Sequence, residues 1–117
     1  GSGDGYGSGY WLAVLRAFSD SARTALAHEN GAIIAFWRSA ADGTPSNGGG
    51  GDAVKAGTVQ EIPGPLKICT KRALHATIDP TKWKGERLWI VALYGEMQRD
   101  GDKIAALKRE ILCEVKQ

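Results

Sequence analysis

Hydrophobic positions near the start of the chain recur every three or four residues. Between residues 10 and 28 these positions are Trp11, Leu15, Phe18, Ala22, Ala25 and Leu26. The spacing predicts one amphipathic helix whose apolar stripe covers a sheet. Asn30 and Gly31 follow, and both residue types favour the left-handed backbone that ends a helix.

Shorter apolar runs after this helix predict β-strands. Residues 32–38 (AIIAFWR) are rich in β-branched and aromatic side chains and apolar on both faces, which is typical of an interior strand. Residues 58–62 and 66–69 predict two short strands. The segment Pro63-Gly64-Pro65 between them predicts a rigid turn.

The strongest strand pattern covers residues 87–97. Trp89 and Val91 alternate there with Leu88 and Ile90, so both faces of the strand are apolar. Gly95 predicts a β-bulge, and the RDGD sequence at 99–102 predicts a tight turn.

The C-terminal segment fits two structures. Ile104, Leu107, Ile111 and Val115 have helical spacing, whereas residues 109–115 also alternate, with Ile111, Cys113 and Val115 on one face. A strand here would pair with residues 88–97 across the turn. We favour a strand over 110–115, which gives an α+β fold: an antiparallel β-sheet with one packed N-terminal amphipathic helix.

The length of 117 residues predicts a single core, and we expect one domain over 10–117. Five glycines alternate through residues 1–9 and five more lie between residues 43 and 51. These runs predict a glycine-rich tail at 1–9 and a long flexible loop at 39–56. Tyr6 and Tyr10 would hold the tail against a second copy of the chain, so we expect a homo-oligomer.

Composition excludes several classes of protein. The longest apolar run, residues 88–94, is far shorter than the ~20 residues of a membrane span. Two cysteines make no disulfide framework, which indicates a reducing, cytoplasmic compartment. The soft metal ligands lack the paired spacing of a zinc site, so we expect no metal. These ligands are His28, Cys69, His75 and Cys113. No GxGxxG spacing occurs either, so we expect no cofactor.

Positive charge is concentrated in residues 67–87, which contain six Lys or Arg residues and only two acidic residues. This local excess attracts phosphates but is too small for a general nucleic-acid surface. Arg and Lys beside Trp hold a planar ring by stacking and its phosphates by charge. The candidate ligand-binding residues are Trp37, Arg38, Lys71, Arg72, His75, Trp83 and Arg87.

Three aromatic residues in or near this stretch need separate interpretation. Trp89 fits the core of its strand. Trp83 lies in the polar sequence DPTKWKG, where both a ligand contact and a structural role stay open. His75 lies between two apolar residues. It would bind a ribose or a phosphate, act as a base, or be a core histidine with one backbone partner.

Short motifs after residue 64 carry a resemblance. They are Cys69, Ala73-Leu74-His75-Ala76, Arg87-Leu88-Trp89, Gly95-Glu96 and Asp102-Lys103-Ile104. With them, residues 64–115 resemble a family of uncharacterised domains of phage and prophage proteins, although Ala73 stands where that family usually has glycine. The helical pattern at 10–28 has no counterpart there. The resemblance implies a viral origin and a β-rich C-terminal half.

A second similarity concerns the sequence from Leu74 to Thr77, which is followed ten residues later by an Arg-aromatic strand. It is similar to the strand after the nucleotide-contacting turn of ADP-ribosyltransferase-like folds. Such an enzyme needs a catalytic glutamate and an early nucleotide contact, for which Glu96 and Arg38 are the candidates.

These observations predict a small phage-encoded binding protein in the cytoplasm of an infected bacterial host. Its function would be anti-defence: it would sequester a nucleotide-derived host signal, such as a cyclic dinucleotide or cyclic ADP-ribose. No catalytic constellation is visible, so we favour binding over catalysis. A structural or assembly protein and an ADP-ribosyltransferase-like enzyme stay open as alternatives. We expect no membrane partner and no specific nucleic acid.

Overall fold

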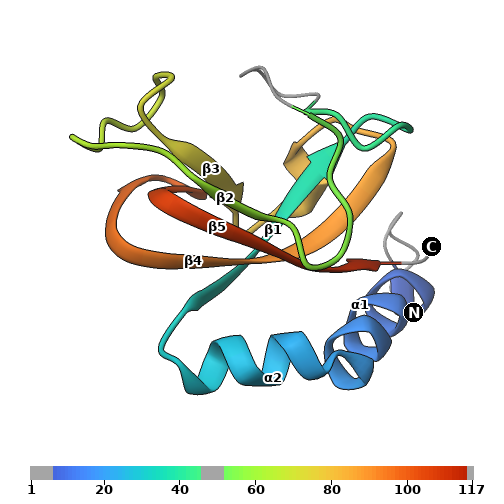
Figure 1. The fold of residues 1–117 in the computed structure, drawn as a ribbon. Coiled ribbons are helices and arrows are strands. Elements are labelled where there is room, and N and C mark those ends of the chain that lie inside the picture. Colours follow the sequence, from blue (N-terminus) through green and yellow to red (C-terminus); the bar gives the residue numbers. More distant parts are fainter. Residues whose placement is uncertain (1–6, 46–51, 116–117) are drawn as a thin grey trace.

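Two helices cover one face of a curled antiparallel sheet, which makes an α+β fold (Figure 1). The computed structural model describes residues 7–45 and 52–115. Its helices are α1 (Gly7–Asp20) and α2 (Ala22–Glu29), with a short 3₁₀ turn, η1 (Pro80–Lys82). Its strands are β1 (Ile33–Ser39), β2 (Val59–Glu61), β3 (Leu74–Thr77), β4 (Arg87–Asp100) and β5 (Lys103–Val115).

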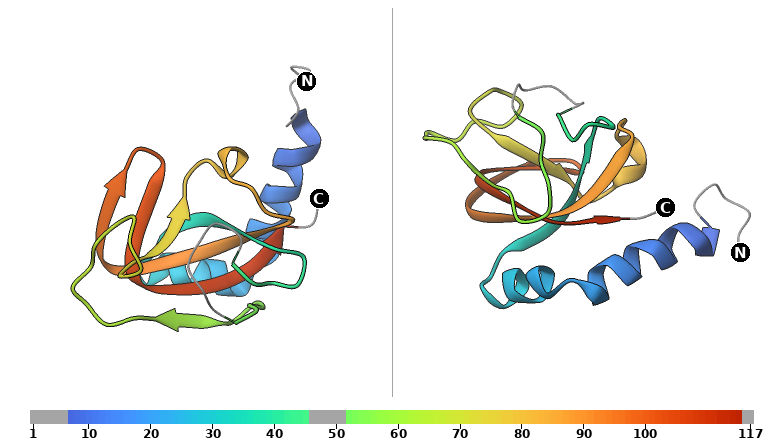
Figure 2. Two further views of the ribbon diagram at one scale, coloured as in Figure 1. Left: turned by 90° about the horizontal axis from the view of Figure 1, so that it is seen from above. Right: turned by 45° about the vertical axis from the view of Figure 1, so that its right-hand side comes forward.

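The strand pairings close into a small barrel. The long β4–β5 hairpin turns at Gly101, and its last pair is Asp100 with Lys103. β1 pairs with β4 along its whole length, β3 pairs with the start of β5, and Phe36 of β1 meets Thr77 of β3. These contacts join β1, β4, β5 and β3 into a ring, which curls around an interior (Figure 2).

β2 extends this ring beside β3. It pairs with β5 in the register Val59–Glu110, Gln60–Arg109 and Glu61–Lys108. Because β3 pairs with residues 103–106 of β5, β2 and β3 lie along the same side of β5, one after the other.

Each side of the sheet packs against its own apolar cluster. The barrel interior is filled by Ala35, Trp37, Trp89, Val91, Leu93, Ile104, Ala106 and Ile111, among others. The opposite side packs against the helices through Val14, Ala27, Leu88, Ile90, Leu112 and Val115, among others. This division confirms that residues 87–97 form a strand with two apolar faces, and that Trp89 belongs to the core.

Two irregularities bend the hairpin. The register shifts between Tyr94 and Met97, where Gly95 has a φ of 82°, so the predicted bulge is confirmed. A second shift lies between Ile90 and Val91, opposite Leu112. The strand at 110–115 is confirmed, but the prediction that Ile111, Cys113 and Val115 share one face is wrong. Ile111 faces the barrel interior, whereas Cys113 and Val115 pack on the helix side, because the shift reverses the alternation.

The N-terminal helix differs from its prediction in two ways. It is broken at Ser21, whose Oγ accepts the Thr24 N–H at 3.0 Å and begins a new helix. Because the break turns the second segment, a stripe counted along one continuous helix does not stay on one face. The described buried residues are Val14, Thr24 and Ala27, whereas Leu15, Phe18 and Leu26 are exposed, as are Ala22 and Ala25. The side chain of Trp11 lies outside the described residues.

Residues 66–69 are not a strand, contrary to the prediction. They form an irregular turn whose backbone groups are bound by a side chain: the Ile68 N–H donates to Gln98 Oε1 at 2.8 Å, and Gln98 Nε2 donates to the Leu66 carbonyl at 3.1 Å. A glutamine thus takes the place of a partner strand. The alternation did not predict β3, whereas the strands at 32–38, 58–62 and 87–97 are confirmed.

Both glycine-rich segments extend beyond the described residues. Gly7 and Gly9 already belong to α1, so the predicted tail at 1–9 is too long, and residues 1–6 lie outside the described part. Residues 46–51 of the predicted loop at 39–56 also lie outside the described part. No helix in the described ranges is both long enough and apolar enough to cross a membrane.

A buried hydrogen bond ties β1 to β4 and can be tested. The indole N–H of Trp89 donates to Ser39 Oγ at 2.9 Å in the barrel interior. Ser39→Ala leaves this buried donor without its acceptor, so we expect the free energy of unfolding to fall by about 1–3 kcal/mol in urea titration. Ser19→Ala, at an exposed serine of α1, is the control. Equal stability of the two variants would contradict this role for Ser39.

Candidate ligand-binding site

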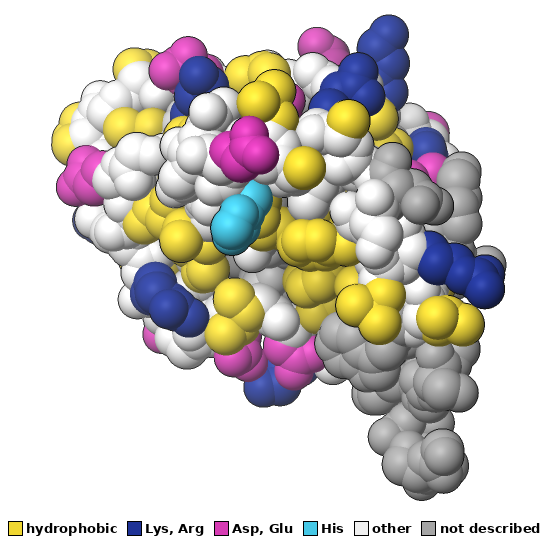
Figure 3. Space-filling model, turned by 90° about the horizontal axis from the view of Figure 1, so that it is seen from below, with side chains coloured by type: hydrophobic (Ala, Val, Ile, Leu, Met, Phe, Trp, Pro, Cys, Tyr) yellow, Lys and Arg dark blue, Asp and Glu magenta, His cyan; other side chains and the backbone are white. Residues whose placement is uncertain are grey.

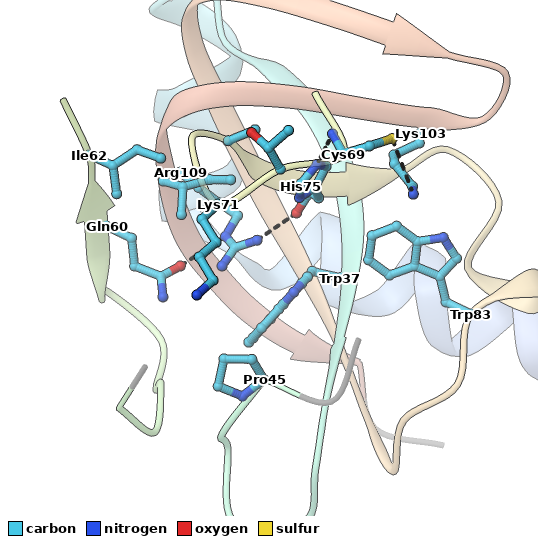
Figure 4. Close-up of a pocket in the computed structure, with 13 residues that line it drawn as sticks. Trp37, Pro45, Gln60, Ile62, Cys69, Lys71, His75, Trp83, Lys103 and Arg109 are labelled. Carbon is cyan, nitrogen blue, oxygen red and sulfur yellow. Dashed lines mark hydrogen bonds between the residues drawn. The ribbon is translucent and has the colours of Figure 1, made fainter. Parts of the chain in front are cut away.

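A cleft of about 650 Å³ opens beside the barrel interior (Figure 4). Four strands and the loops between them contribute to its wall. The residues that line it are Trp37, Pro45, Gln60, Ile62, Cys69, Thr70, Lys71, Ala73, Leu74, His75, Trp83, Lys103 and Arg109. These thirteen described residues include three cations and no carboxylate, so the lining has a positive potential.

Arg109 of β5 is the buried cation of this cleft, with only 4% of its surface exposed. Its Nε donates to Gln60 Oε1 at 2.8 Å and its Nη1 donates to the backbone carbonyl of His75. The guanidinium lies 4.5 Å from the centre of the Trp37 ring, which provides a cation–π contact. Its position is therefore fixed by two hydrogen bonds and one ring.

None of these partners carries a negative charge. Within residues 7–45 and 52–115, no carboxylate forms an ion pair with Arg109, and its Nη2 makes no hydrogen bond. Burial lowers the pKa of Arg109 to about 10, so the side chain still carries its charge at neutral pH. A buried charge without a counter-charge is costly, because it has lost its hydration. The cleft thus holds a fixed cation that this part of the protein does not neutralise.

Two lysines and a tryptophan complete the polar wall. Figure 4 shows Lys71 and Arg109 on the side of the cleft toward β2, and Lys103 and Trp83 on the opposite side. Lys71 is exposed and Lys103 is half-buried. Trp83 is also half-buried and packs on the interior cluster, so part of its ring stays accessible beside Lys103.

His75 holds the loop that precedes β3. Its Nε2 accepts the backbone N–H of Cys69 at 2.9 Å, and Cys69 has a left-handed φ of 65°. An imidazole that accepts at Nε2 is neutral and carries its proton on Nδ1. Burial first, and then the charges of Lys103 and Arg109, lower the pKa of His75. The ring is therefore neutral near pH 7 and positions the loop.

Four predicted site residues line the cleft: Trp37, Lys71, His75 and Trp83. Their roles differ. Trp37 is 3% exposed and lies under the guanidinium of Arg109, so it supports the cation rather than a ligand ring. Trp83 is the accessible ring.

The structure places the other three predicted site residues outside this lining. Arg38 points away from the side of β1 that carries Trp37, and its Nε and Nη1 donate to the carbonyls of Pro80 (2.8 Å) and Gly85 (3.3 Å). Arg87 lies over the Trp89 ring and pairs with a carboxylate of β5, that of Glu114. Arg72 is exposed. The basic residues at 67–87 therefore do not converge as a set: Lys71 lines the cleft, whereas Arg72 is exposed on its loop and Arg87 pairs with Glu114.

Gln60, Lys103 and Arg109 were not among the predicted site residues. For Arg109 a signal exists in the printed sequence: it precedes Ile111 by two residues, so a strand places a cation on its apolar face. Gln60 and Lys103 carry no such signal, because only the pairing of β2 and β3 with β5 brings them to the cleft.

Comparisons with protein-family models, with curated proteins and with solved structures gave no match for this chain. The phage resemblance and the implied viral origin therefore stay predictions. The ADP-ribosyltransferase similarity gains no support from the site, because neither Glu96 nor Arg38 lines the cleft.

The lowered pKa of His75 predicts a dependence of stability on pH. Between its unfolded value of about 6.5 and its lower folded value, the unfolded chain takes up a proton more readily than the folded chain does. The contribution of His75 to the free energy of unfolding is thus fully present above about pH 6.5. It is lost as the pH falls toward the pKa of His75 in the folded protein.

We expect His75→Gln to remove this part of the acid destabilisation, which melting temperatures measured between about pH 7.5 and pH 5.5 will show. His28→Gln, at the exposed histidine of α2, is the control. If both variants lose stability on acidification as much as the wild type does, His75 does not stay neutral in the fold.

Proposed function

We propose that this protein binds a small nucleotide-like ligand, an anion that carries a planar ring, in the cleft between β1, β2, β3 and β5. The observation that supports this proposal most directly is Arg109, a buried guanidinium held by two neutral acceptors and a ring. An anionic ligand would supply the counter-charge that is missing from the described residues.

The arrangement assigns a part of the ligand to each side chain. A phosphate oxygen accepts from Arg109 Nη2, where charge-assisted hydrogen bonds are strong because little water competes. Lys71 and Lys103 add positive charge nearer the surface. The accessible part of Trp83 stacks on the ring of the ligand. Binding in this mode depends on the charge of the ligand and on its ring.

Binding without turnover is the function that these residues favour. The thirteen lining residues contain no carboxylate to act as a base, and the acceptor nitrogen of His75 is engaged by the Cys69 amide. Capture of a host nucleotide signal by a phage protein is the biological setting that we propose for such a binding protein. Its cytoplasmic location belongs to the same proposal.

Arg109→Met tests the function because methionine keeps the length of the side chain and removes the charge. We expect the wild type to bind at least one of AMP, ADP, ADP-ribose and a cyclic dinucleotide at micromolar concentration in calorimetric titration. Arg109→Met should weaken this binding at least about tenfold, which corresponds to ~1.4 kcal/mol. We expect a lower melting temperature, because Gln60 Oε1 and the His75 carbonyl lose their donor, and a cooperative melting transition shows that the variant is folded.

Arg72→Met removes one positive charge from the loop beside the cleft and is the matched control. It should bind as the wild type does. Wild-type protein that binds none of the four compounds at millimolar concentration would reject the proposed function, and so would equal affinities of the wild type and Arg109→Met.

Self-association is a second candidate, and the helix face supports it. Figure 3, which views the molecule from the side of the helices, shows hydrophobic side chains gathered there. The exposed large apolar residues of α1, α2 and the start of β1 are Leu12, Leu15, Phe18, Leu26 and Ile33. A second copy of the chain would cover them.

We expect a dimer or a larger assembly in native mass spectrometry, and a monomer for the double variant Leu15→Glu/Leu26→Glu, which puts two charges among the exposed apolar residues of the helices. A monomeric wild type at tens of micromolar would rule out this candidate.

A further inference from the structure

We propose that Gln60 is the specificity-determining residue of the cleft: its neutral amide holds Arg109 in place and leaves the positive charge for an anionic ligand. This inference rests on the proposed function and explains how the site selects phosphate-bearing compounds over their neutral counterparts.

The sheet register puts Gln60 and Arg109 directly opposite each other. They are partners in the antiparallel pairing of β2 with β5, and the side-chain Oε1 of Gln60 accepts the Arg109 Nε–H at 2.8 Å. The flanking residues of β2 point to the other face, where Glu61 is exposed and pairs in register with Lys108. Among the three residues of β2, only Gln60 therefore presents its side chain to the guanidinium.

A glutamate at this position would be the stronger partner. Opposite charges at directly paired positions stabilise an antiparallel sheet, and a carboxylate receives both Nε–H and Nη2–H of an arginine side-on. It would neutralise Arg109 and occupy Nη2, which has no partner among the described residues. The amide does neither, because it offers one uncharged acceptor. The protein thus retains a less stable contact and, with it, an available cation.

This arrangement defines the chemical class of the ligand. The part of the ligand that reaches Arg109 has to be an anionic oxygen, because a neutral group leaves the buried charge uncompensated. A nucleoside without phosphate offers the ring for Trp83 but no counter-charge. We therefore expect AMP to bind and adenosine to bind far more weakly, with inorganic phosphate as the probe for the anionic part alone.

The test compares Gln60→Glu with Gln60→Met. Gln60→Glu should raise the melting temperature of the ligand-free protein by about 4 °C. It should also lower the affinity for AMP and for phosphate at least about tenfold. Gln60→Met should lower the melting temperature, because Arg109 loses an acceptor. It should retain AMP binding, because the charge of Arg109 stays available. A merely structural glutamine would move stability and binding in the same direction in both variants.

Arg72→Gln changes the net charge by the same amount as Gln60→Glu, outside the cleft, and should alter neither property. The role of Gln60 is overturned if Gln60→Glu binds AMP as tightly as the wild type does, or if its melting temperature is lower. In either case the proposed function still stands as long as the wild type binds AMP. If the wild type binds neither phosphate nor any of the four nucleotide compounds, the proposed function fails. A rise in melting temperature of Gln60→Glu then marks Gln60 as a structural neighbour of Arg109 only.

Discussion

The buried charge of Arg109 is the constraint on which the arrangement of the cleft depends. A guanidinium removed from water needs hydrogen bonds and a counter-charge, and the described residues provide the first without the second. Trp37 below it and Gln60 beside it are both explained by this need, because each stabilises the cation without neutralising it. The remaining positive potential is available to a ligand.

The barrel makes this arrangement possible. β5 is long enough to pair with β4 on one side and with both β2 and β3 on the other, so side chains from distant parts of the chain meet around Arg109. The irregularities of the hairpin let it curl, and the Phe36–Thr77 pair closes the ring. The loop before β3 is fixed by Gln98 and by the His75–Cys69 hydrogen bond, which positions Lys71 and the wall of the cleft.

Sequence patterns predicted the parts of this fold that depend on local alternation. β1, β4, the Gly95 bulge and the C-terminal strand were recognisable, because apolar alternation and glycine have local causes. The stripe of the N-terminal helix was not, since the cap at Ser21 breaks it. The site was half predictable. Trp37, Lys71, His75 and Trp83 followed from residue type, whereas Gln60 and Lys103 reach the cleft only through long-range pairing, and the helix-compatible spacing of the C-terminal segment obscured Arg109.

Nuclear magnetic resonance of the arginine side chains tests the central claim most directly. Resonances of Arg109 Nε and Nη report on the hydrogen bonds and the charge of its partners, and titration with AMP and with adenosine separates the anionic part of a ligand from its ring. We expect AMP to shift the Nη resonances of Arg109 and to slow their hydrogen exchange, and adenosine to leave both unchanged. Nη resonances of Arg109 that respond to neither compound would show that its charge is not available to a ligand, which would contradict this account.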